Sequence, residues 1–391
     1  MKRLFKIQFL MLVFFFQACG IPNNETQTSV PIQNTVWENP SSSVIKSNES
    51  ILLAQNEASS QPAVSLNNAK QTISIIGVGD IMLGTNYPSA QYLPRNKGKN
   101  LMAAVNSILN DADITFGNLE GTILNKGTTI KNCQKCYAFR MPEYLADNLI
   151  TAGFDVMSIA NNHVRDFGQN GINNTMRVLN KLGIHAAGIE NKLESVTFEK
   201  EGVKYGFAAF APNIGTVQIT NIPHAKEIVQ ALKKTSDIVI VSFHGGAEGT
   251  AHQRVKRKTE HFYGENRGNV YQFAHAVIDA GADIVFGHGP HVTRAVEVYN
   301  DRFIAYSLGN FCTYGRFSLR GETKIAPIIK VNVDRKGRFI DAKITPIVQI
   351  KNDRVKKDTS KRAISTIQRL TRLDKFDQNI RISNDGLITK K

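Results

Sequence analysis

The stretch FDVMSIANNH, residues 154–163, is an apolar run that ends abruptly in a small residue, two amides and an imidazole. Buried strands of an α/β sheet present polar side chains at their carboxyl ends, where ligands collect. We therefore predict a strand over the apolar part of this run. Asn162 and His163 are expected to face a site at its end.

Other apolar runs end in the same way. Residues 73–79, 238–243 and 283–286 lead into Asp80, into His244 and into GHGPH at 287–291, and residues 113–116 lead into GNLE at 117–120. Helices are expected between the runs, over 101–109, 142–152, 171–182 and 269–280, with a hairpin over 194–210. Strands that alternate with helices at this spacing predict an α/β domain with a mostly parallel sheet.

Three aspartates stand at the opposite ends of predicted strands. They are Asp155, Asp237 and Asp283, each just before an apolar run. We expect them to be surface or capping residues, separate from the site.

The composition is that of a folded, basic protein. The chain has 391 residues, 42% of them hydrophobic and 21% charged, and a formal net charge of +15. This is enough for one large α/β domain with extensions, and it excludes a disordered or fibrous chain. The charge favours anionic partners such as an acidic polymer, phosphate groups or lipid headgroups. Nucleic acid is not expected, because no basic motif is interleaved with aromatic residues.

The amino terminus has the pattern of an export signal. Basic residues flank an apolar run at 7–16, which is too short to span a bilayer stably. The following FQACG resembles a bacterial lipoprotein processing site, so Cys19 is the expected lipidated residue. Simple signal cleavage and an uncleaved anchor remain alternatives. The protein is thus expected to be membrane-anchored and to face the periplasm or the cell exterior.

The rest of the chain divides into three parts. Residues 20–70 are polar and without periodicity, which predicts a flexible tether. Residues 71–350 form the predicted domain, and the basic residues 351–391 form an extension that packs on it through a helix capped by Ser360.

The remaining cysteines give no metal motif. Cys133 and Cys136 form a lone Cys-x-x-Cys pair, and a zinc site would need a second pair. In an oxidising compartment we expect a local disulfide between them, which leaves Cys312 as a buried free thiol.

Six motifs in order resemble the bacterial capsule synthesis CapA family of poly-γ-glutamate capsule proteins. They are GVGDIMLG at 77–84, FGNLEGT at 116–122, ANNHVRDFG at 160–168, FHGGAE at 243–248, GHGPHV at 287–292 and YSLGNF at 306–311. The resemblance implies a metallophosphatase-like fold, a four-layer α/β/β/α sandwich with mixed sheets and a metal site at the strand ends. It also implies a role in making, anchoring or processing an anionic cell-surface polymer.

The chain departs from the wider metallophosphatase pattern in its first and second motifs and in its last. Met82 stands at the first histidine position, and Asn118 replaces the usual bridging aspartate, with Glu120 two residues later. The last motif is lengthened between His288 and His291. The expected number of metal ions is therefore one or two.

The chemistry of this residue set can also be argued directly. Carboxylates and imidazoles suit Mn, Fe or Zn, and a bound ion with an open position activates water. His163 is assigned as the catalytic acid or base, and His291 to either catalysis or metal binding. Arg294, Arg254 and Glu248 are the candidate substrate-binding residues. The assigned metal ligands are Asp80, Glu120, Asn162, His244 and His288.

Two main functions follow. One is a metal-dependent hydrolase or transferase that acts on an anionic envelope polymer, polyglutamate or polysaccharide, or on its precursor. The other, which the missing histidine at Met82 motivates, is a non-catalytic polymer-binding subunit of a capsule synthesis and export complex. A secreted nucleotidase is a third option. Membrane synthesis or export subunits are the expected protein partners.

Overall fold

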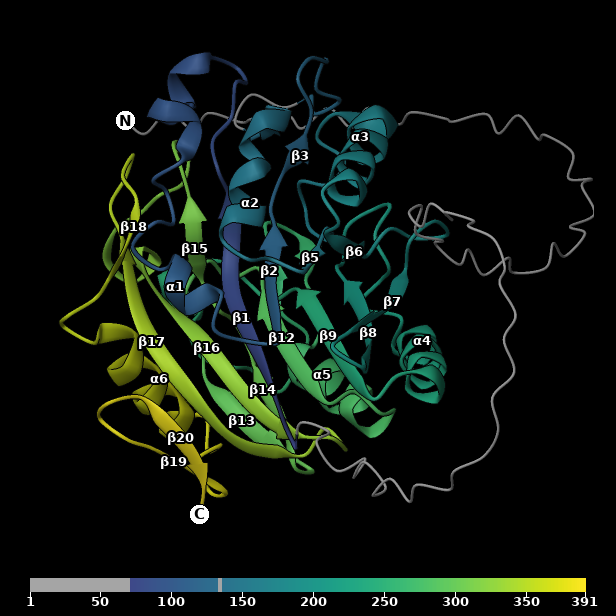
Figure 1. The fold of residues 1–391 in the computed structure, drawn as a ribbon, viewed down its shortest axis with the longest axis vertical. Coiled ribbons are helices and arrows are strands. Elements are labelled where there is room, and N and C mark those ends of the chain that lie inside the picture. The colour runs from purple at the N-terminus through teal and green to yellow at the C-terminus, as the bar shows by residue number, and fades with distance from the viewer. Residues whose placement is uncertain (1–70, 133–135) are drawn as a thin grey trace, which may run out of the picture. The chain divides into compact units, whose positions relative to one another are not determined.

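The computed structural model describes residues 71–132 and 136–391 (Figure 1). The predicted signal, Cys19, the tether and Cys133 lie outside these residues. Cys136 is disulfide-bonded, and Cys312 is a buried free thiol. Among the described residues, no helix combines the length and the apolar character needed to cross a membrane.

The larger sheet is mixed and has ten strands. Its strands follow the order β19-β20-β17-β16-β1-β2-β5-β6, while β15 pairs with β1 and β18 pairs with β17. β1, β2, β5 and β6 are parallel, as the alternation of strands and helices predicts, and β16 is antiparallel to β1. The bounds are β1 Thr72–Met82, β2 Ile114–Leu119, β5 Val156–Ser158, β6 His185–Ala187, β15 Asn310–Thr313, β16 Ile325–Asp334, β17 Phe339–Gln349, β18 Val355–Lys357, β19 Ile380–Ile382 and β20 Leu387–Lys390.

The second sheet has six strands in the order β13-β14-β12-β9-β8-β7. Its four central strands are parallel, and the edge strands β13 and β7 are antiparallel to their neighbours. The predicted hairpin is confirmed, since β7 and β8 join at Glu201 and Gly202, both with positive φ. The bounds are β7 Ser195–Lys200, β8 Val203–Phe210, β9 Ile238–His244, β12 Ile284–His288, β13 Val296–Tyr299 and β14 Arg302–Ala305. Two small ribbons pair β3 Thr122–Ile123 with β4 Arg140–Met141, and β10 His261–Phe262 with β11 Glu265–Asn266.

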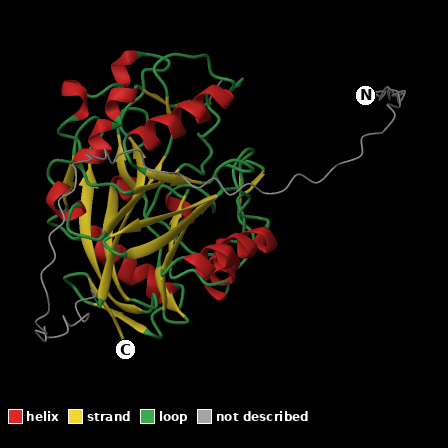
Figure 2. Ribbon diagram, turned by 45° about the vertical axis from the view of Figure 1, so that its right-hand side comes forward, coloured by secondary structure: helices red, strands yellow, loops and turns green. Residues whose placement is uncertain are grey.

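The helices cover the outer faces of the two sheets (Figure 2). α1 Asn106–Leu109, α2 Asp147–Thr151 and α3 Gly168–Lys181 lie on the larger sheet, and α4 Ile222–Thr235 and α5 Val270–Asp279 lie on the smaller one. Short 3-10 turns occupy Ala90–Tyr92, Arg95–Gly98, Glu143–Leu145, Thr250–His252 and Gly321–Lys324. The inner faces of the sheets meet in one apolar core, where Phe116 stacks on Phe286 with ring centroids 5.4 Å apart. The predicted four-layer α/β/β/α sandwich is therefore confirmed.

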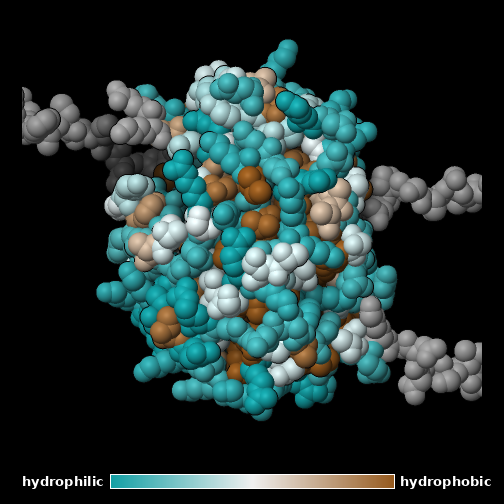
Figure 3. Space-filling view, turned by 90° about the vertical axis from the view of Figure 1, so that its left-hand side faces the viewer, coloured by the Kyte–Doolittle hydropathy of each residue, from teal (hydrophilic) through white to brown (hydrophobic). Residues whose placement is uncertain are grey.

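The carboxyl-terminal residues pack on this sandwich. α6, Arg362–Leu373, buries Ile364, Ile367 and Leu370 against the cores, and each such side chain contributes about 1.5–3 kcal/mol. Ser360 does not cap the helix as predicted. The side chain of Asp358 accepts instead from the backbone N–H groups of Ser360 and Arg362, at 3.2 Å each. The surface on this side of the molecule is mainly hydrophilic, with apolar residues in small groups (Figure 3).

A row of aspartates holds the starting ends of the central parallel strands. Asp113, Asp155, Asp237 and Asp283 each stand one residue before a strand. Each accepts a hydrogen bond of 2.8 Å from a backbone N–H of the neighbouring strand, in turn Ser74, Thr115, Lys204 and Val239. The capping role predicted for three of them matches these contacts, although Asp283 is fully buried rather than a surface residue.

Candidate metal centre

The opposite ends of these strands carry the candidate site. In the larger sheet Asp80 of β1 stands opposite Asn118 of β2, and Asn118 stands opposite Ser158 of β5. In the smaller sheet His244 and His288, the last residues of β9 and β12, stand opposite each other. Parallel strands in register bring their carboxyl ends to one edge of a sheet, so polar residues far apart in the chain become neighbours.

A close backbone contact fixes the end of β1. The backbone N–H of Asp80 donates to the carbonyl of Gly309 at 2.8 Å. A Cβ atom at Gly79 would stand 2.0 Å from that same carbonyl oxygen, so only glycine fits there. The position of Asp80 is thereby set by the loop before β15.

Asp80 is the hub of the cluster. Its Oδ1 accepts from Asn118 Nδ2 at 2.9 Å and lies 3.2 Å from His288 Nδ1, and its Oδ2 lies 2.9 Å from His291 Nδ1. Burial by itself would raise the pKa of Asp80, but the hydrogen bonds with the two histidines outweigh it and hold the pKa well below the ordinary range. Asp80 is therefore an anion at neutral pH.

Glu120 and His291 face each other beside this hub. Glu120 Oε1 lies 3.4 Å from His291 Nε2, and the donor atoms of Asp80, Glu120 and His291 all lie within 4.8 Å of one another. Burial raises the pKa of Glu120 well above its ordinary value. His291 has a left-handed backbone with φ of 55°, a conformation that non-glycine residues adopt rarely. The fold thus accepts local strain to aim this imidazole at the two carboxylates.

Several buried atoms of the predicted ligands find no hydrogen-bond partner within the described part of the chain. They belong to predicted metal ligands, namely both oxygens of Glu120, Oδ1 of Asn162, both ring nitrogens of His244 and Nε2 of His288. Buried polar atoms are nearly always hydrogen-bonded, so such a group points to a missing partner. Carboxylate and amide oxygens with imidazole nitrogens form a donor set that suits Mn, Fe or Zn. The residues therefore fit a divalent ion.

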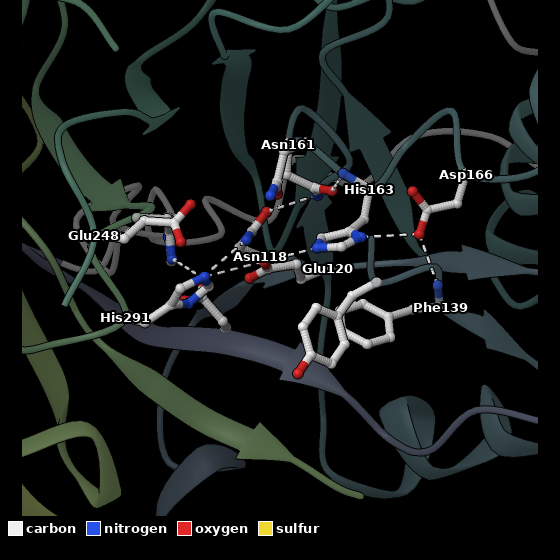
Figure 4. A network of polar contacts seen from close by, with 12 residues as sticks. Asn118, Glu120, Phe139, Asn161, His163, Asp166, Glu248 and His291 are labelled. Carbon is white, nitrogen blue, oxygen red and sulfur yellow. Dashed lines mark hydrogen bonds and ion pairs between the residues drawn. The ribbon is translucent and has the colours of Figure 1, made fainter. Parts of the chain in front are cut away.

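Asp166 orients His163 and is itself paired with Lys131; neither residue was assigned a role from the sequence motifs. The Nδ1 atom of His163 lies 2.8 Å from Asp166 Oδ2, and the opposite nitrogen, Nε2, faces Glu120 Oε1 at 3.9 Å. Asp166 also accepts from the Phe139 backbone N–H at 2.7 Å and pairs with Lys131 Nζ at 2.5 Å. Figure 4 shows this chain of contacts from Phe139 through Asp166 to His163. The sequence signal was present, since Asp166 follows His163 by three residues in the quoted motif.

Burial controls the charge of two of the buried histidines, His163 and His244. It lowers the pKa of His163, and the positive charge of Lys131 adds to this effect, whereas Asp166 opposes it. Burial also lowers the pKa of His244, well below the ordinary value. Both side chains are thus neutral at neutral pH, which is the form that accepts a proton or binds a metal.

The departures from the metallophosphatase pattern have structural counterparts. Met82 is fully buried, and its Sδ accepts from the backbone N–H of Gly84 at 3.3 Å. Asn118 links Asp80 to Asn161 by donating to the first and accepting from the second at 3.2 Å. Neither position offers the imidazole or the carboxylate of the wider pattern.

Both predicted substrate-binding arginines pair with carboxylates of the chain. Arg294 is fully buried, and its guanidinium forms two 2.8 Å bonds with Glu260. Arg254 pairs with Asp374 and donates to the carbonyl of Leu373 at 2.6 Å. The Arg294 guanidinium is therefore used within the protein, whereas the Arg254 side chain is 51% exposed and its substrate-binding role stays a prediction.

Glu248, the third of these residues, does lie beside the cluster. Figure 4 shows it next to His291. It also forms an ion pair with Arg267, with Oε1 3.0 Å from Nη2. The glycine-rich turn before it offers no free N–H groups, because those of Gly245, Gly246 and Ala247 donate within the protein.

The fold and this cluster define a class of protein, an α/β/β/α sandwich with a buried carboxylate and imidazole centre at its strand ends. The chain belongs to the bacterial capsule synthesis protein PGA_cap family, whose model matches residues 74–314. This confirms the resemblance drawn from the sequence motifs.

The chain is similar to named bacterial proteins and to solved structures. It is 28% identical to the PGA biosynthesis protein CapA of Bacillus subtilis over 80% of this chain and 80% of that protein. It is also 28% identical to the capsule biosynthesis protein CapA of Bacillus anthracis, over 62% of this chain and 60% of that protein. Among solved structures it is similar to a 5′-nucleotidase precursor from Thermus thermophilus, with 11% identity, a TM-score of 0.40, and coverage of 80% of this chain and 61% of the other.

Proposed function

We propose that this protein is a metal-dependent hydrolase or transferase of the phosphoesterase type. Its substrate would be an anionic envelope polymer, such as polyglutamate or an acidic polysaccharide, or the precursor of such a polymer. The observation that carries the proposal is the set of buried, unpartnered donor atoms of Glu120, His244 and His288, three residues that interact with Asp80. Single unpartnered atoms also occur elsewhere in the described residues, but here they gather on residues that interact with one buried carboxylate.

The proposed ligands are Asp80, Glu120, Asn162, His244 and His288, with His291 in reach of the two carboxylates. A divalent ion held there would supply Lewis acidity and an activated water.

His163 would move the proton. Its Nδ1 is held by Asp166, which fixes the ring and leaves Nε2 toward the site. Because burial keeps the ring neutral, Nε2 can accept a proton from the attacking group. His163 can then return that proton to the leaving group. The lowered pKa of His163 thus favours a role as general base first and general acid second. It disfavours a histidine that is already protonated when the substrate binds.

The biological setting is inferred from the family and from charge. Relatives carry names that refer to capsule and PGA biosynthesis, and the net charge of +15 favours an anionic polymer. We infer an accessory role in capsule or polyglutamate synthesis at the cell envelope. Lipidation at Cys19 and contact with membrane synthesis or export subunits belong to the same proposal.

The test uses the purified full chain. Its metal content is measured by mass spectrometry, and turnover is assayed on model phosphodiesters and γ-glutamyl peptides. We expect about one or two ions per chain and a loss of turnover of about 100-fold or more in His163→Ala. Arg338→Gln is the control, since this exposed arginine pairs with Asp334 at the opposite edge of the sheet. A wild-type protein without metal and without turnover would refute the proposal.

One observation favours a second candidate, a polymer-binding subunit without catalysis. Met82 removes a histidine that the wider metallophosphatase pattern has, and its sulfur is bonded within its own turn. Complementation of a capsule-deficient strain separates the two functions. If His163→Ala and Asp80→Asn both restore a full capsule, the binding subunit is the correct interpretation.

A further inference from the structure

Arg267 is a buried arginine with an unused donor, and it pairs with Glu248. Its side chain is 5% exposed. Nη2 lies 3.0 Å from Glu248 Oε1, and Nε lies 2.8 Å from Glu265 Oε2. Nε has this ion pair but no hydrogen bond, and the third nitrogen, Nη1, is buried and has neither within residues 71–132 and 136–391. Five N–H groups on a guanidinium are rarely left unmatched when the group is buried.

The backbone places this arginine at the site. The carbonyl of Arg267 accepts from the backbone N–H of Gly246, two residues after the predicted ligand His244. Its own N–H donates to the carbonyl of Glu260 at 2.8 Å. The loop that ends β9 and the segment after β11 are therefore joined at Arg267.

Its charge acts on the cluster. Burial is the largest influence on both neighbouring groups, raising the pKa of Glu120 and lowering that of His244, and the positive charge of Arg267 reaches both side chains, where it lowers each pKa. Glu248, the ion-pair partner of Arg267, lies beside His291 (Figure 4). Arg267 is thus within electrostatic reach of two predicted ligands.

We propose that Arg267 binds an oxyanion of the substrate, a phosphoryl oxygen or a carboxylate, through Nη1. The inference rests on the proposed function for the identity of the reacting group, and it replaces the anion-binding role predicted for Arg294. Since Glu248 and Glu265 hold the other two nitrogens, the contact is a single charge-assisted bond. The two carboxylates fix the guanidinium in advance, which reduces the entropy that binding would otherwise cost.

Glu248 limits how many nitrogens of Arg267 can contact the substrate. It competes with the substrate for Nη2, so its removal would let the guanidinium bind an oxyanion through two nitrogens. Glu248→Gln is therefore expected to tighten oxyanion binding by about threefold or more. That gain should vanish in the Glu248→Gln/Arg267→Gln double variant, because the gain requires the guanidinium.

The experiment titrates the full-length protein with inorganic phosphate and, separately, with glutarate, in calorimetry with and without EDTA. Arg267→Gln should weaken binding by about tenfold or more, as expected for the loss of a hydrogen bond to a charged group. Arg267→Lys should recover the melting temperature but not the affinity, since its single ammonium stays with Glu248. Arg338→Gln, an exposed arginine that also pairs with a carboxylate, should bind as the wild type does.

Each result decides the inference. Tighter binding of phosphate indicates that Arg267 contacts a phosphoryl oxygen of the substrate, and tighter binding of glutarate indicates a carboxylate. Equal affinity in wild type and Arg267→Gln, in both metal conditions, overturns the proposal, and so does a wild type that binds neither oxyanion. Metal content and turnover of the wild type are measured in parallel. A failure of the proposed function is therefore seen separately from a failure of Arg267.

Discussion

Replacing Glu120 with glutamine separates two effects on stability: the destabilisation caused by the buried carboxylate and the stabilisation that a bound metal ion would supply. The side chain is fully buried, and neither carboxylate oxygen has a hydrogen-bond partner among the described residues. The 3.4 Å ion pair with His291 only partly offsets the cost of burying this carboxylate, because burial still raises its pKa well above the ordinary value. A buried charged group without hydrogen bonds costs about 1–3 kcal/mol or more. Glutamine keeps the shape and removes the charge. We therefore expect the free energy of unfolding of the metal-free protein to rise by about 1 kcal/mol or more.

The sign should reverse when metal is present. An ion at about 100 times its dissociation constant stabilises the native state by about 2.7 kcal/mol. Glutamine is a weaker ligand than glutamate, so Glu120→Gln should lose most of this gain. Because 1 kcal/mol corresponds to about 2–4 °C in a domain of 150–250 residues, both effects are measurable by thermal unfolding. The assay compares EDTA with added Mn²⁺ or Zn²⁺.

The stabilisation of Glu120→Gln over the wild type in EDTA should also depend on pH. Burial raises the pKa of Glu120 in the folded protein, so the folded state binds a proton there more tightly than the unfolded state does. The wild type is therefore favoured at acidic pH and loses this advantage as the pH rises through the folded pKa. The difference between Glu120→Gln and wild type in EDTA should be smallest at acidic pH and grow toward neutrality.

Glu227→Gln is the matched control, since that side chain is 74% exposed. It should change the melting temperature little in either buffer. If Glu120→Gln lowers the melting temperature in EDTA and keeps the full metal-induced shift, Glu120 is a structural residue and not a ligand.

Three further substitutions test other parts of the structure. Asp166→Asn should reduce turnover by about 100-fold or more while leaving metal content unchanged, because it misorients His163; unchanged turnover would contradict that role. Arg294→Met should lower the free energy of unfolding in urea by about 3–5 kcal/mol, since Glu260 would be left as an unpaired buried charge. A decrease below about 1 kcal/mol would contradict a stabilising role for the Arg294–Glu260 pair. Asp283→Ala should cost about 1–3 kcal/mol in the same assay by removing the partner of a buried N–H, and an unchanged midpoint would count against the capping role.

The sequence was sufficient to predict the sheets and the edge that carries the cluster. Asp80, His244 and His288 each follow an uninterrupted apolar run, and the carboxyl ends of parallel strands meet by geometry. Helix α4 was absent from the predicted elements, although Asn221 accepts from the His224 N–H and Pro223 stands in the first turn. That start signal is local and could have been used.

The partners of the two predicted arginines could not be found from the sequence. Charge in a sequence does not reveal which partner the fold supplies. Arg294 meets Glu260 across 34 residues, and Arg254 meets Asp374 across 120. Such long-range pairs depend on tertiary packing. The same limit hid Lys131, which lies in a loop of unremarkable composition yet contacts Asp166.

The aspartates at the starting ends of the strands affect how precisely the residues at the carboxyl ends are positioned. Side chains of a strand alternate between its two faces, so sliding one strand by a single residue would turn every side chain to the wrong face. Each aspartate binds a particular N–H of the adjacent strand, so it admits only one alignment. The strand alignment that these aspartates hold at one end of the sheets is thus what brings Asp80, His244 and His288 into fixed positions at the other end.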